Sequence, residues 1–375
     1  MKVHMRFALA LAVLSILISV GADYALTPAQ RLCDQAMNLD ASHPNKSLRL
    51  YRQAAAAGSN KAMYLLGTHY LSGGRNFHKA VKWLRRAVRA HNPAAGFFLA
   101  TCYQCGHGVP QNYSKALALY REAAALGDYN SVYAIGALYQ HGRGVPRNYV
   151  KALAWYRKAA ARRVPAAMYE IGELYYKGEG VKQSYAKAMS WWLRTGEGEP
   201  IAWASVGSLY ERGEGVAKNY GLAMKYYRKA VAIGDIDAQF YIGYNYQHGF
   251  GVEKNYEKAL SWYRQGEFNN GRCKYAIGRM YELGYGVKKN DAKAMQCYRG
   301  VVAWSRGSGR WYTYAATIGG KAMLRIGVLY ELGEGVPKND AKALSWYRKA
   351  QLSGGIVSQE AKRRAASVAV LLRAK

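Results

Sequence analysis

Five cysteines are spread through the sequence, and two of them, Cys102 and Cys105, have the spacing of a C-x-x-C pair. Two thiols at this spacing are suited to disulfide exchange, and they are also typical of one half of a zinc site. The sequence has no second C-x-x-C, and no alternation of predicted strands and helices surrounds this one. It therefore predicts no metal site and no cofactor, and leaves a Cys102–Cys105 disulfide or two buried thiols as the alternatives.

Ser184 and Lys187 match the S-x-x-K motif, in which a lysine amine lies beside the nucleophilic serine of β-lactamases and penicillin-binding proteins. That chemistry also needs S-D-N and K-T-G elements. S-D-N is absent, and the nearest imitation of K-T-G is the R-T-G at 194–196. Ser184 stands where another copy of the segment carries Asn148, and both residue types are preferred at helix N-termini. A helix cap is the favoured interpretation, and a β-lactamase-like hydrolase is the alternative.

Both motifs lie in a segment that the chain repeats. A G-x-G-V turn recurs at intervals of 35 or 36 residues, with one final interval of 49. An active-site loop is needed once, whereas a structural unit recurs, so the repeated residues are expected to serve packing first. The second glycine of each turn is Gly108, Gly144, Gly180, Gly215, Gly251, Gly286 or Gly335.

Each repeat contains two predicted helices. In one copy Pro165 suits a first helical position, and Met168, Ile171 and Tyr175 follow at the spacing of one helical face. The second helix of the preceding copy begins after Asn148, a predicted N-cap. One hairpin cannot bury its own apolar face, but stacked hairpins can. The sequence therefore predicts an all-α solenoid of helix-turn-helix repeats.

Small residues recur where the helices should meet. Glycine inside a helix costs about 1 kcal/mol relative to alanine, so its recurrence indicates close approach of neighbouring helices. The first-helix column is Gly67, Gly136, Gly172, Gly207, Gly243, Gly278 and Gly327, and the second-helix column is Ala116, Ala152, Ala188, Ala223, Ala259, Ala294 and Ala343. Aromatic columns at helical spacing favour core packing over an exposed stacking surface. They are Tyr103, Tyr139, Tyr175, Tyr210, Tyr246, Tyr281 and Tyr330, with Trp83, Trp155, Trp191, Trp262 and Trp346.

The pattern A-x-x-x-G-x-x-Y-x-x-G-x-G-V-x-x-[ND]-x-x-K-A-x-x-W-[YF]-x-x-A resembles the Sel-one-like repeat, a longer relative of the tetratricopeptide repeat. The resemblance covers roughly residues 61–350. It implies an all-α, right-handed superhelical α-solenoid that acts as an adaptor for protein complexes and is often exported in bacteria. Leu222, at the lysine position, and Leu119 and Cys297, at the tryptophan position, depart from the pattern.

The domain boundaries follow from the repeat. We expect a signal peptide at 1–22, an N-terminal cap and half-repeat at 23–60, eight repeats at 61–350 and a C-terminal capping helix at 351–375. Within the cap helix, Ala361, Ala365, Val368 and Leu372 share one face and should meet the stack. Cys273 and Cys297 belong to two helices of one repeat, so they are the preferred disulfide pair among the five cysteines.

The longest interval contains an insertion near 301–314. Insertions in solenoids emerge as loops on one face, often the binding face. This one is rich in the residue types of binding hot spots. The predicted partner-binding residues are Trp304, Arg306, Arg310, Trp311, Tyr312 and Tyr314. A longer helix pair that fills its own gap is the alternative.

The chain is strongly basic, with 54 lysines and arginines against 23 aspartates and glutamates and a formal net charge of +31. Such a charge attracts acidic partners. Fifteen of the basic residues recur once per repeat and should form ridges, which either only keep the protein soluble or receive an acidic partner. They are Lys79, Lys115, Lys151, Lys187, Lys258, Lys293, Lys342, Arg52, Arg85, Arg121, Arg157, Arg228, Arg264, Arg299 and Arg348.

The first 22 residues have the features of a secretory signal: Lys2 and Arg6, an apolar stretch at 7–20 and small residues at 20–22. An uncleaved membrane anchor is the alternative. Export to the periplasm or beyond the cell argues against nucleic acid as the partner. We therefore expect a non-enzymatic adaptor for an acidic protein surface, with direct binding of anionic lipid, lipopolysaccharide or a cell-wall polymer as alternatives.

Overall fold

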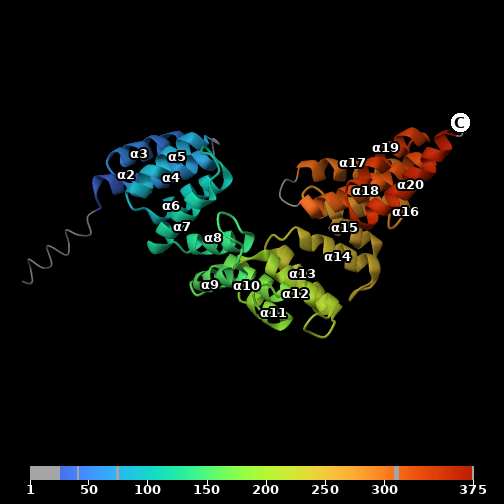
Figure 1. Ribbon diagram of the computed structural model, residues 1–375, viewed down its shortest axis with the longest axis horizontal. Helices are drawn as coiled ribbons and strands as arrows, with labels where there is room; N and C mark the ends of the chain where they lie inside the picture. Colours follow the sequence, from blue (N-terminus) through green and yellow to red (C-terminus); the bar gives the residue numbers. More distant parts are fainter. Residues whose placement is uncertain (1–25, 40–41, 73–75, 308–311, 374–375) are drawn as a thin grey trace, which may run out of the picture. The chain divides into compact units, whose positions relative to one another are not determined.

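The computed structural model describes residues 26–39, 42–72, 76–307 and 312–373, and these contain 19 α-helices, one 3-10 turn and no strand (Figure 1). Two units are distinguished by their internal contacts: unit 1 extends to Leu174 and includes Glu179–Val181, and unit 2 comprises Tyr175–Gly178 and Lys182–Lys375. The predicted signal peptide lies outside the described residues. The all-α solenoid is as predicted, and the handedness of its superhelix stays a prediction.

Unit 1 consists of helical hairpins in which each helix packs on the next. Its helices are α2 (Pro28–Leu39), α3 (Pro44–Ala56), α4 (Asn60–Ser72), α5 (Phe77–Arg89), α6 (Pro93–Cys105), α7 (Tyr113–Ala125), α8 (Tyr129–His141), α9 (Tyr149–Ala160) and the greater part of α10 (Pro165–Lys177).

Unit 2 continues the same hairpins, including the last residues of α10. Its helices are α11 (Tyr185–Leu193), η1 (Gly196–Gly198), α12 (Pro200–Arg212), α13 (Tyr220–Ala232), α14 (Asp237–His248), α15 (Tyr256–Gly266), α16 (Gly271–Leu283), α17 (Asp291–Gly307), α18 (Tyr312–Leu332), α19 (Asp340–Gln351) and α20 (Gly355–Arg373).

The two helices of a hairpin meet through glycine and tyrosine. A Cβ atom added to Gly136 of α8 would lie 2.6 Å from the ring of Tyr156 on α9, and one added to Gly243 of α14 would lie 2.6 Å from the ring of Tyr263 on α15. The predicted alanine column is fully buried in the same interface. Close approach of the helices, expected from the recurring small residues, is confirmed.

The G-x-G-V turn fixes the entry into each second helix. Gly142 and Gly144 have φ angles of 65° and 71°, which favour glycine. A Cβ atom at Gly144 would also lie 2.6 Å from the Cβ atom of Tyr113, so the turn touches the start of the preceding second helix. After the turn, the Asn148 side chain accepts a 2.8 Å bond from the backbone N–H of Lys151. The predicted N-cap is therefore confirmed.

In six of the second helices, a buried tyrosine pairs with the first helix of its own hairpin. The hydroxyl of Tyr120 donates to Gln104 at 3.1 Å, and that of Tyr227 donates to Glu211 at 2.6 Å. Burial raises the pKa of Tyr120 to about 12, so its hydroxyl stays protonated as a donor. The same pairing recurs at Tyr156–Gln140, Tyr263–Gln247, Tyr298–Glu282 and Tyr347–Glu331.

The insertion lengthens two helices and does not form a fourteen-residue loop. α17 has 17 residues and α18 has 21, whereas the other repeat helices of this unit have 9 to 13. Residues 301–307 continue α17, and Tyr312 already belongs to α18. The inserted residues that the structure describes, 301–307 and 312–314, are therefore helical, and the loop interpretation was wrong for them.

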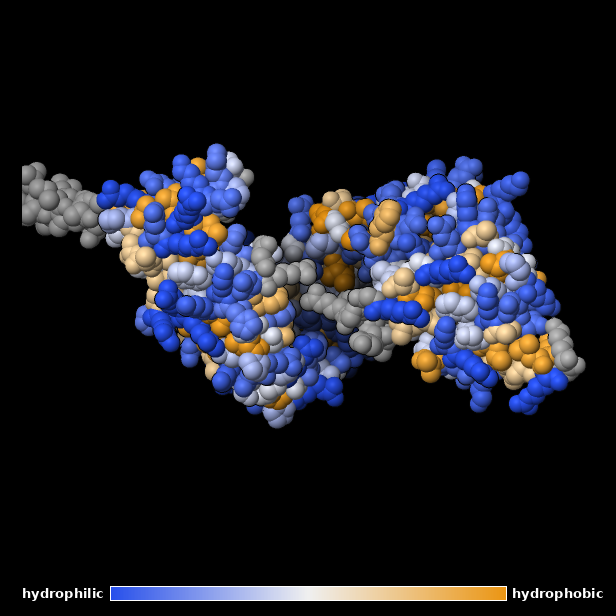
Figure 2. All heavy atoms as spheres, turned by 90° about the horizontal axis from the view of Figure 1, so that it is seen from above, coloured by the Kyte–Doolittle hydropathy of each residue, from blue (hydrophilic) through white to orange (hydrophobic). Residues whose placement is uncertain are grey.

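The last helix closes unit 2. Ala361, Ala365 and Val368 of α20 are buried, and Leu372 packs against the same cluster of α17, α18 and α19 side chains. These four residues form the face that the sequence spacing assigned to the stack. Hydrophilic residues cover most of the visible face of each unit (Figure 2), in keeping with the net charge of +31. None of the described helices is long and apolar enough to cross a membrane.

Candidate binding surface

The repeated lysines and arginines converge on the repeated tyrosines. In each rung, a tyrosine near the end of a first helix accepts a hydrogen bond from an arginine of the preceding hairpin. The lysine of its own hairpin lies over the tyrosine ring. We call the six complete rungs, with the Tyr175–Lys187 pair, the cationic ladder. Its complete rungs are Arg52–Tyr70–Lys79, Arg85–Tyr103–Lys115, Arg121–Tyr139–Lys151, Arg228–Tyr246–Lys258, Arg264–Tyr281–Lys293 and Arg299–Tyr330–Lys342.

The geometry of a rung is set by three successive helices. In unit 1, Arg85 of α5 donates to the hydroxyl of Tyr103 on α6 at 2.8 Å, and the Lys115 ammonium of α7 lies 5.7 Å from the centre of that ring. This ammonium–ring distance is within the range of a cation–π contact. The tyrosine thus holds two cations from two different hairpins on one surface.

Unit 2 repeats this geometry closely. Arg264 of α15 donates to Tyr281 of α16 at 3.2 Å, and Lys293 of α17 lies 5.3 Å from the centre of the same ring. At the start of the unit, the Lys187 ammonium lies 5.5 Å from the ring of Tyr175. The tyrosine column, predicted as core packing, therefore packs in the interior and also holds the ridges in register.

In each unit, the rungs of the ladder form an exposed cationic surface. Its lysines and arginines are solvent-exposed, and in the complete rungs none of them forms an ion pair with an acidic residue of the described chain. A guanidinium group has five N–H donors, so a bond to one tyrosine leaves donors for a carboxylate. Such a surface can bind a row of carboxylates or other anions.

Ser184 and Lys187 do not form a nucleophilic pair. The Ser184 hydroxyl caps α11, accepting a 3.3 Å bond from the backbone N–H of Lys187, as Asn148 does for α9. The Lys187 ammonium lies over Tyr175 as part of the ladder. Each residue has the structural role of its repeat position, as the favoured interpretation predicted.

Family comparison agrees with this repeating geometry. The Sel1 repeat matches nine segments: residues 41–59, 60–92, 93–128, 130–163, 165–198, 204–235, 236–266, 271–299 and 320–351. This chain belongs to the Sel1 repeat family. The first segment is the shortest, in agreement with the half-repeat that the sequence predicted before eight full copies. Sel1 repeats typically mediate protein–protein interaction.

Two solved structures are similar to the chain. A protective antigen present in uropathogenic Escherichia coli strains, described as displaying an SLR fold, is 27% identical, with 86% of this chain and 70% of that chain covered and a TM-score of 0.62. A Sel1 repeat protein from Oxalobacter formigenes is 31% identical, with 62% of this chain and 96% of that chain covered and a TM-score of 0.59. No curated protein matches the chain.

All five cysteines of this Sel1 repeat protein are free thiols in the structure. Cys102 is buried and Cys105 exposed, and burial raises the pKa of Cys102 to about 11. Cys273 is buried beside Gly266 of α15, while Cys297 packs over Gly278 of α16. Disulfides between these pairs in an oxidising compartment stay predictions. The described residues contain no group of three or more histidine, cysteine, aspartate or glutamate side chains that could hold a metal ion.

Among the predicted partner-binding residues of the insertion, the structure describes the side chains of Trp304 and Arg306. Trp304 is half-buried on α17, where its ring covers Gly271 of α16, and Arg306 is exposed on the same helix. Arg310 and Trp311 lie outside the described residues. Tyr312 and Tyr314 belong to α18. Trp304 therefore serves helix packing, and a binding role of the remaining residues stays a prediction.

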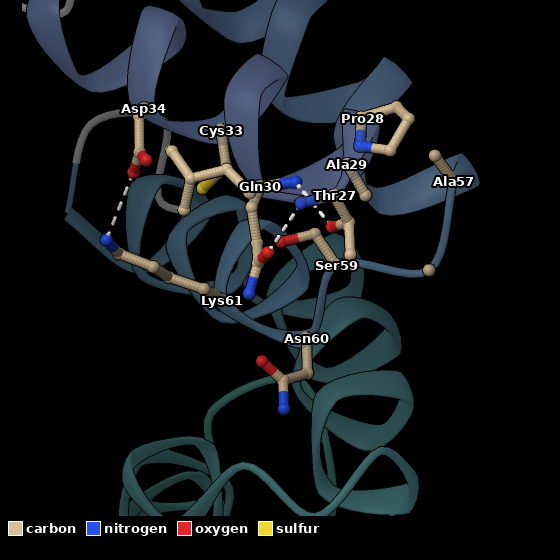
Figure 3. Close-up of a pocket in the computed structure, with 12 residues that line it drawn as sticks. Thr27, Pro28, Ala29, Gln30, Cys33, Asp34, Ala57, Ser59, Asn60 and Lys61 are labelled. Atoms are coloured by element: carbon tan, nitrogen blue, oxygen red, sulfur yellow. Dashed lines mark hydrogen bonds and ion pairs between the residues drawn. The ribbon is translucent and has the colours of Figure 1, made fainter. Parts of the chain in front are cut away.

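A pocket of about 720 Å³ lies at the first hairpin of unit 1 (Figure 3). Its polar side chains already have partners within the chain. Thr27 and Gln30 form a capping box for α2, in which each side chain accepts a bond from the other's backbone N–H, at 2.7 and 3.2 Å. Lys61 pairs with Asp34 at 3.5 Å. The pocket therefore offers no unpaired group to a ligand among these residues.

The sequence identified both basic columns but missed their common partner. It placed the tyrosines in the core and the lysines and arginines on ridges. In five of the six complete rungs, the arginine and the tyrosine that it bonds are 17 or 18 positions apart, as Arg85 and Tyr103 are. The insertion lengthens this offset to 31 in the Arg299–Tyr330 rung. The constant offset between the arginine and tyrosine columns was the signal that could have revealed the ladder.

Proposed function

We propose that this Sel1 repeat protein is a non-enzymatic adaptor that binds an acidic surface of a partner protein through the cationic ladder. The observation that carries the proposal is the recurrence of one rung geometry in both units, with exposed cations held by tyrosine. Because tyrosine already orders each arginine, less side-chain freedom is lost when a carboxylate binds. A partner with carboxylates in a row would meet several rungs.

The proposed location is the periplasm or the cell exterior. Its support is the charged start, apolar stretch and small-residue site of the first 22 residues. The similarity to a protein described as a protective antigen is a further support. In that location acidic proteins are the proposed partners, and anionic lipid or a cell-wall polymer is the competing class.

Binding of fluorescein-labelled poly-L-glutamate, measured by anisotropy over a range of salt concentrations, tests the proposal. The double variant Arg85→Gln/Arg121→Gln removes two rung cations from unit 1. Exposed ion pairs contribute about 0.2–1 kcal/mol each, so loss of two of them should weaken the affinity by about twofold to thirtyfold at low salt. The matched control Lys82→Gln/Arg89→Gln removes the same charge from exposed positions outside the ladder and should bind nearly as wild type.

Equal losses in the two double variants would show that net charge alone attracts the polyanion, and would overturn the ladder. Stronger binding to vesicles containing phosphatidylglycerol than to poly-L-glutamate would favour the lipid alternative. Nitrocefin turnover that disappears in Ser184→Ala would overturn the non-enzymatic assignment. Circular dichroism of each variant checks that the helices are retained.

A further inference from the structure

One repeat departs from the others at the position of the second-helix aromatic residue. This position holds a ring in most hairpins, such as Trp155 of α9, Trp262 of α15 and Trp346 of α19. On α9 and α19 a lysine three residues later covers the ring, with Lys158 4.5 Å and Lys349 4.4 Å from the ring centres. On α17 the corresponding residues are Cys297 and Gly300. Both the ring and its cover are therefore missing there.

A lysine enters the space from the neighbouring helix. Lys274 of α16 stands where α10 and α18 carry Met168 and Met323, and where α8 carries Val132. Its chain is half-buried and lies against Gly300, because a Cβ atom added there would be 2.9 Å from the Lys274 Cδ atom. Three departures from the repeat, Lys274, Cys297 and Gly300, thus occur at one place in the fold.

The result is a cationic pocket of about 290 Å³ between α15, α16 and α17. Ile277, which is 2% exposed, lies at its base. Its walls carry three cations and one carboxylate, and two of the cations belong to the Tyr281 rung of the ladder. Its charged lining residues are Arg264, Lys274, Lys293 and Glu267. A second hollow, of about 430 Å³, shares Tyr281 and Lys293 with it and adds Lys288 and Lys289.

We propose that this pocket binds the carboxylate side chain of a glutamate or aspartate in an acidic segment of the partner protein. This inference rests on the proposed function. It adds the site at which one acidic side chain of the partner binds. The surplus of two positive charges requires an anion, and the volume suits a single side chain. Arg264 can keep its bond to Tyr281, at 3.2 Å, while donating other N–H groups to the carboxylate.

Cys297 leaves space in the pocket because its side chain is smaller than the ring found in other repeats. Burial raises the pKa of its thiol to about 11, so at neutral pH it is neither a nucleophile nor a negative charge that would compete with the ligand.

Unit 1 shows that loss of the tryptophan alone does not make a cationic pocket. Leu119 of α7 also replaces the ring, and Gly96 of α6 stands at the position of Lys274. The hollow there has about 380 Å³, and Val88, Leu119 and Leu126 give it an apolar lining. The charge of the pocket beside Cys297 is therefore a property of this repeat, and the unit 1 hollow is a natural control.

Methyl NMR of isoleucine-labelled full-length chain tests the pocket. The probe is an N-acetylated, C-amidated Gly-Glu-Glu-Gly peptide, and the same peptide with glutamine is its uncharged control. We expect a saturable shift of the Ile277 methyl signal with the acidic peptide only. Ile135 has the equivalent position on α8 of unit 1 and should not shift.

Two substitutions restore the common repeat residues and should abolish the response. Cys297→Trp fills the pocket, and Lys274→Met removes its central cation without adding bulk. Each should weaken the peptide affinity by about tenfold or more. Leu119→Trp makes the matched change in unit 1 and should leave the affinity unchanged.

Absence of a saturable Ile277 shift at millimolar peptide, an equal shift with the glutamine peptide, or unchanged affinity in Lys274→Met would overturn the pocket. If poly-L-glutamate still distinguishes the Arg85→Gln/Arg121→Gln variant from its control, the ladder stands and only the pocket fails. Loss of both responses would remove the proposed function as well.

Discussion

The contact between glycine and tyrosine shows why a residue with poor helix propensity recurs inside a helix. Gly207 of α12 faces Tyr227 of α13, and a Cβ atom at Gly207 would lie 2.7 Å from the ring atom Cε1. Tyr227 is fully buried, and its hydroxyl donates to Glu211 at 2.6 Å, so the ring is held in place. The helix-propensity cost of glycine is offset by the close packing that it permits.

Replacement of Gly207 by alanine should therefore destabilise the protein, although alanine is the better helix former. We expect a loss of about 1–3 kcal/mol in the free energy of unfolding, because the ring must shift. The control is Gly221→Ala on α13, an exposed helical position where the nearest atom to the new Cβ would be Asn219 Oδ1 at 3.4 Å. Gly221→Ala should stabilise by about 0.5–1 kcal/mol. Urea unfolding measures both, and effects of the same sign would contradict the packing argument.

At the level of helices, much of the fold could be predicted because its signals are local. The cap at Asn148, the turn at Gly144 and the buried face of Met168 and Ile171 depend on residues a few positions apart. The ladder and the pocket beside Cys297 depend on residues from three successive helices, and their contacts follow from how hairpins stack. The insertion was misjudged because extra residues in a solenoid can lengthen two helices as well as form a loop.

An ion pair between helices adds specificity to one part of unit 2. Glu282 of α16 is 5% exposed and is bonded by Arg325 of α18, by Arg279 at 2.9 Å and by the hydroxyl of Tyr298. The equivalent residue on α8 is Gln140, which receives the hydroxyl of Tyr156 without any arginine in the described contacts. The buried charge of Glu282 is thus what requires Arg325.

Arg325→Met should destabilise unit 2 by about 3 kcal/mol, because a buried carboxylate loses a charged partner. The second substitution, Glu282→Gln, removes the negative charge of Glu282. It leaves an amide that can accept the hydroxyl of Tyr298, as Gln140 of α8 accepts the hydroxyl of Tyr156. The double variant Glu282→Gln/Arg325→Met should therefore recover at least half of the loss. Chemical unfolding followed by circular dichroism measures the three proteins. A double variant less stable than Arg325→Met would show that the carboxylate is needed for another reason.

Over the whole molecule, stabilising contacts are arranged along the chain. Within each unit, the main packing contacts join a helix to the next helix or to the one after it. Stability in such an array is approximately a sum of terms from each repeat and its neighbours. The ladder uses the same arrangement, since each rung draws on only three successive helices. A few rungs can therefore bind a partner surface without any contribution from the remaining rungs.

This arrangement predicts that the loss of one buried side chain destabilises only the neighbouring helices. Tyr120 of α7 and Tyr263 of α15 are both buried and have the same place in their repeats. Truncation of such a ring to alanine costs about 3–5 kcal/mol, so local opening should become about 100-fold more frequent or more. In Tyr120→Ala we expect faster hydrogen exchange in α6–α8, and in Tyr263→Ala in α14–α16, with the other set near its wild-type rate. Exchange measured by mass spectrometry on both variants provides reciprocal controls. A uniform increase along the chain in either variant would mean that the repeats unfold as one cooperative body, and the sum of neighbour terms would then be the wrong description.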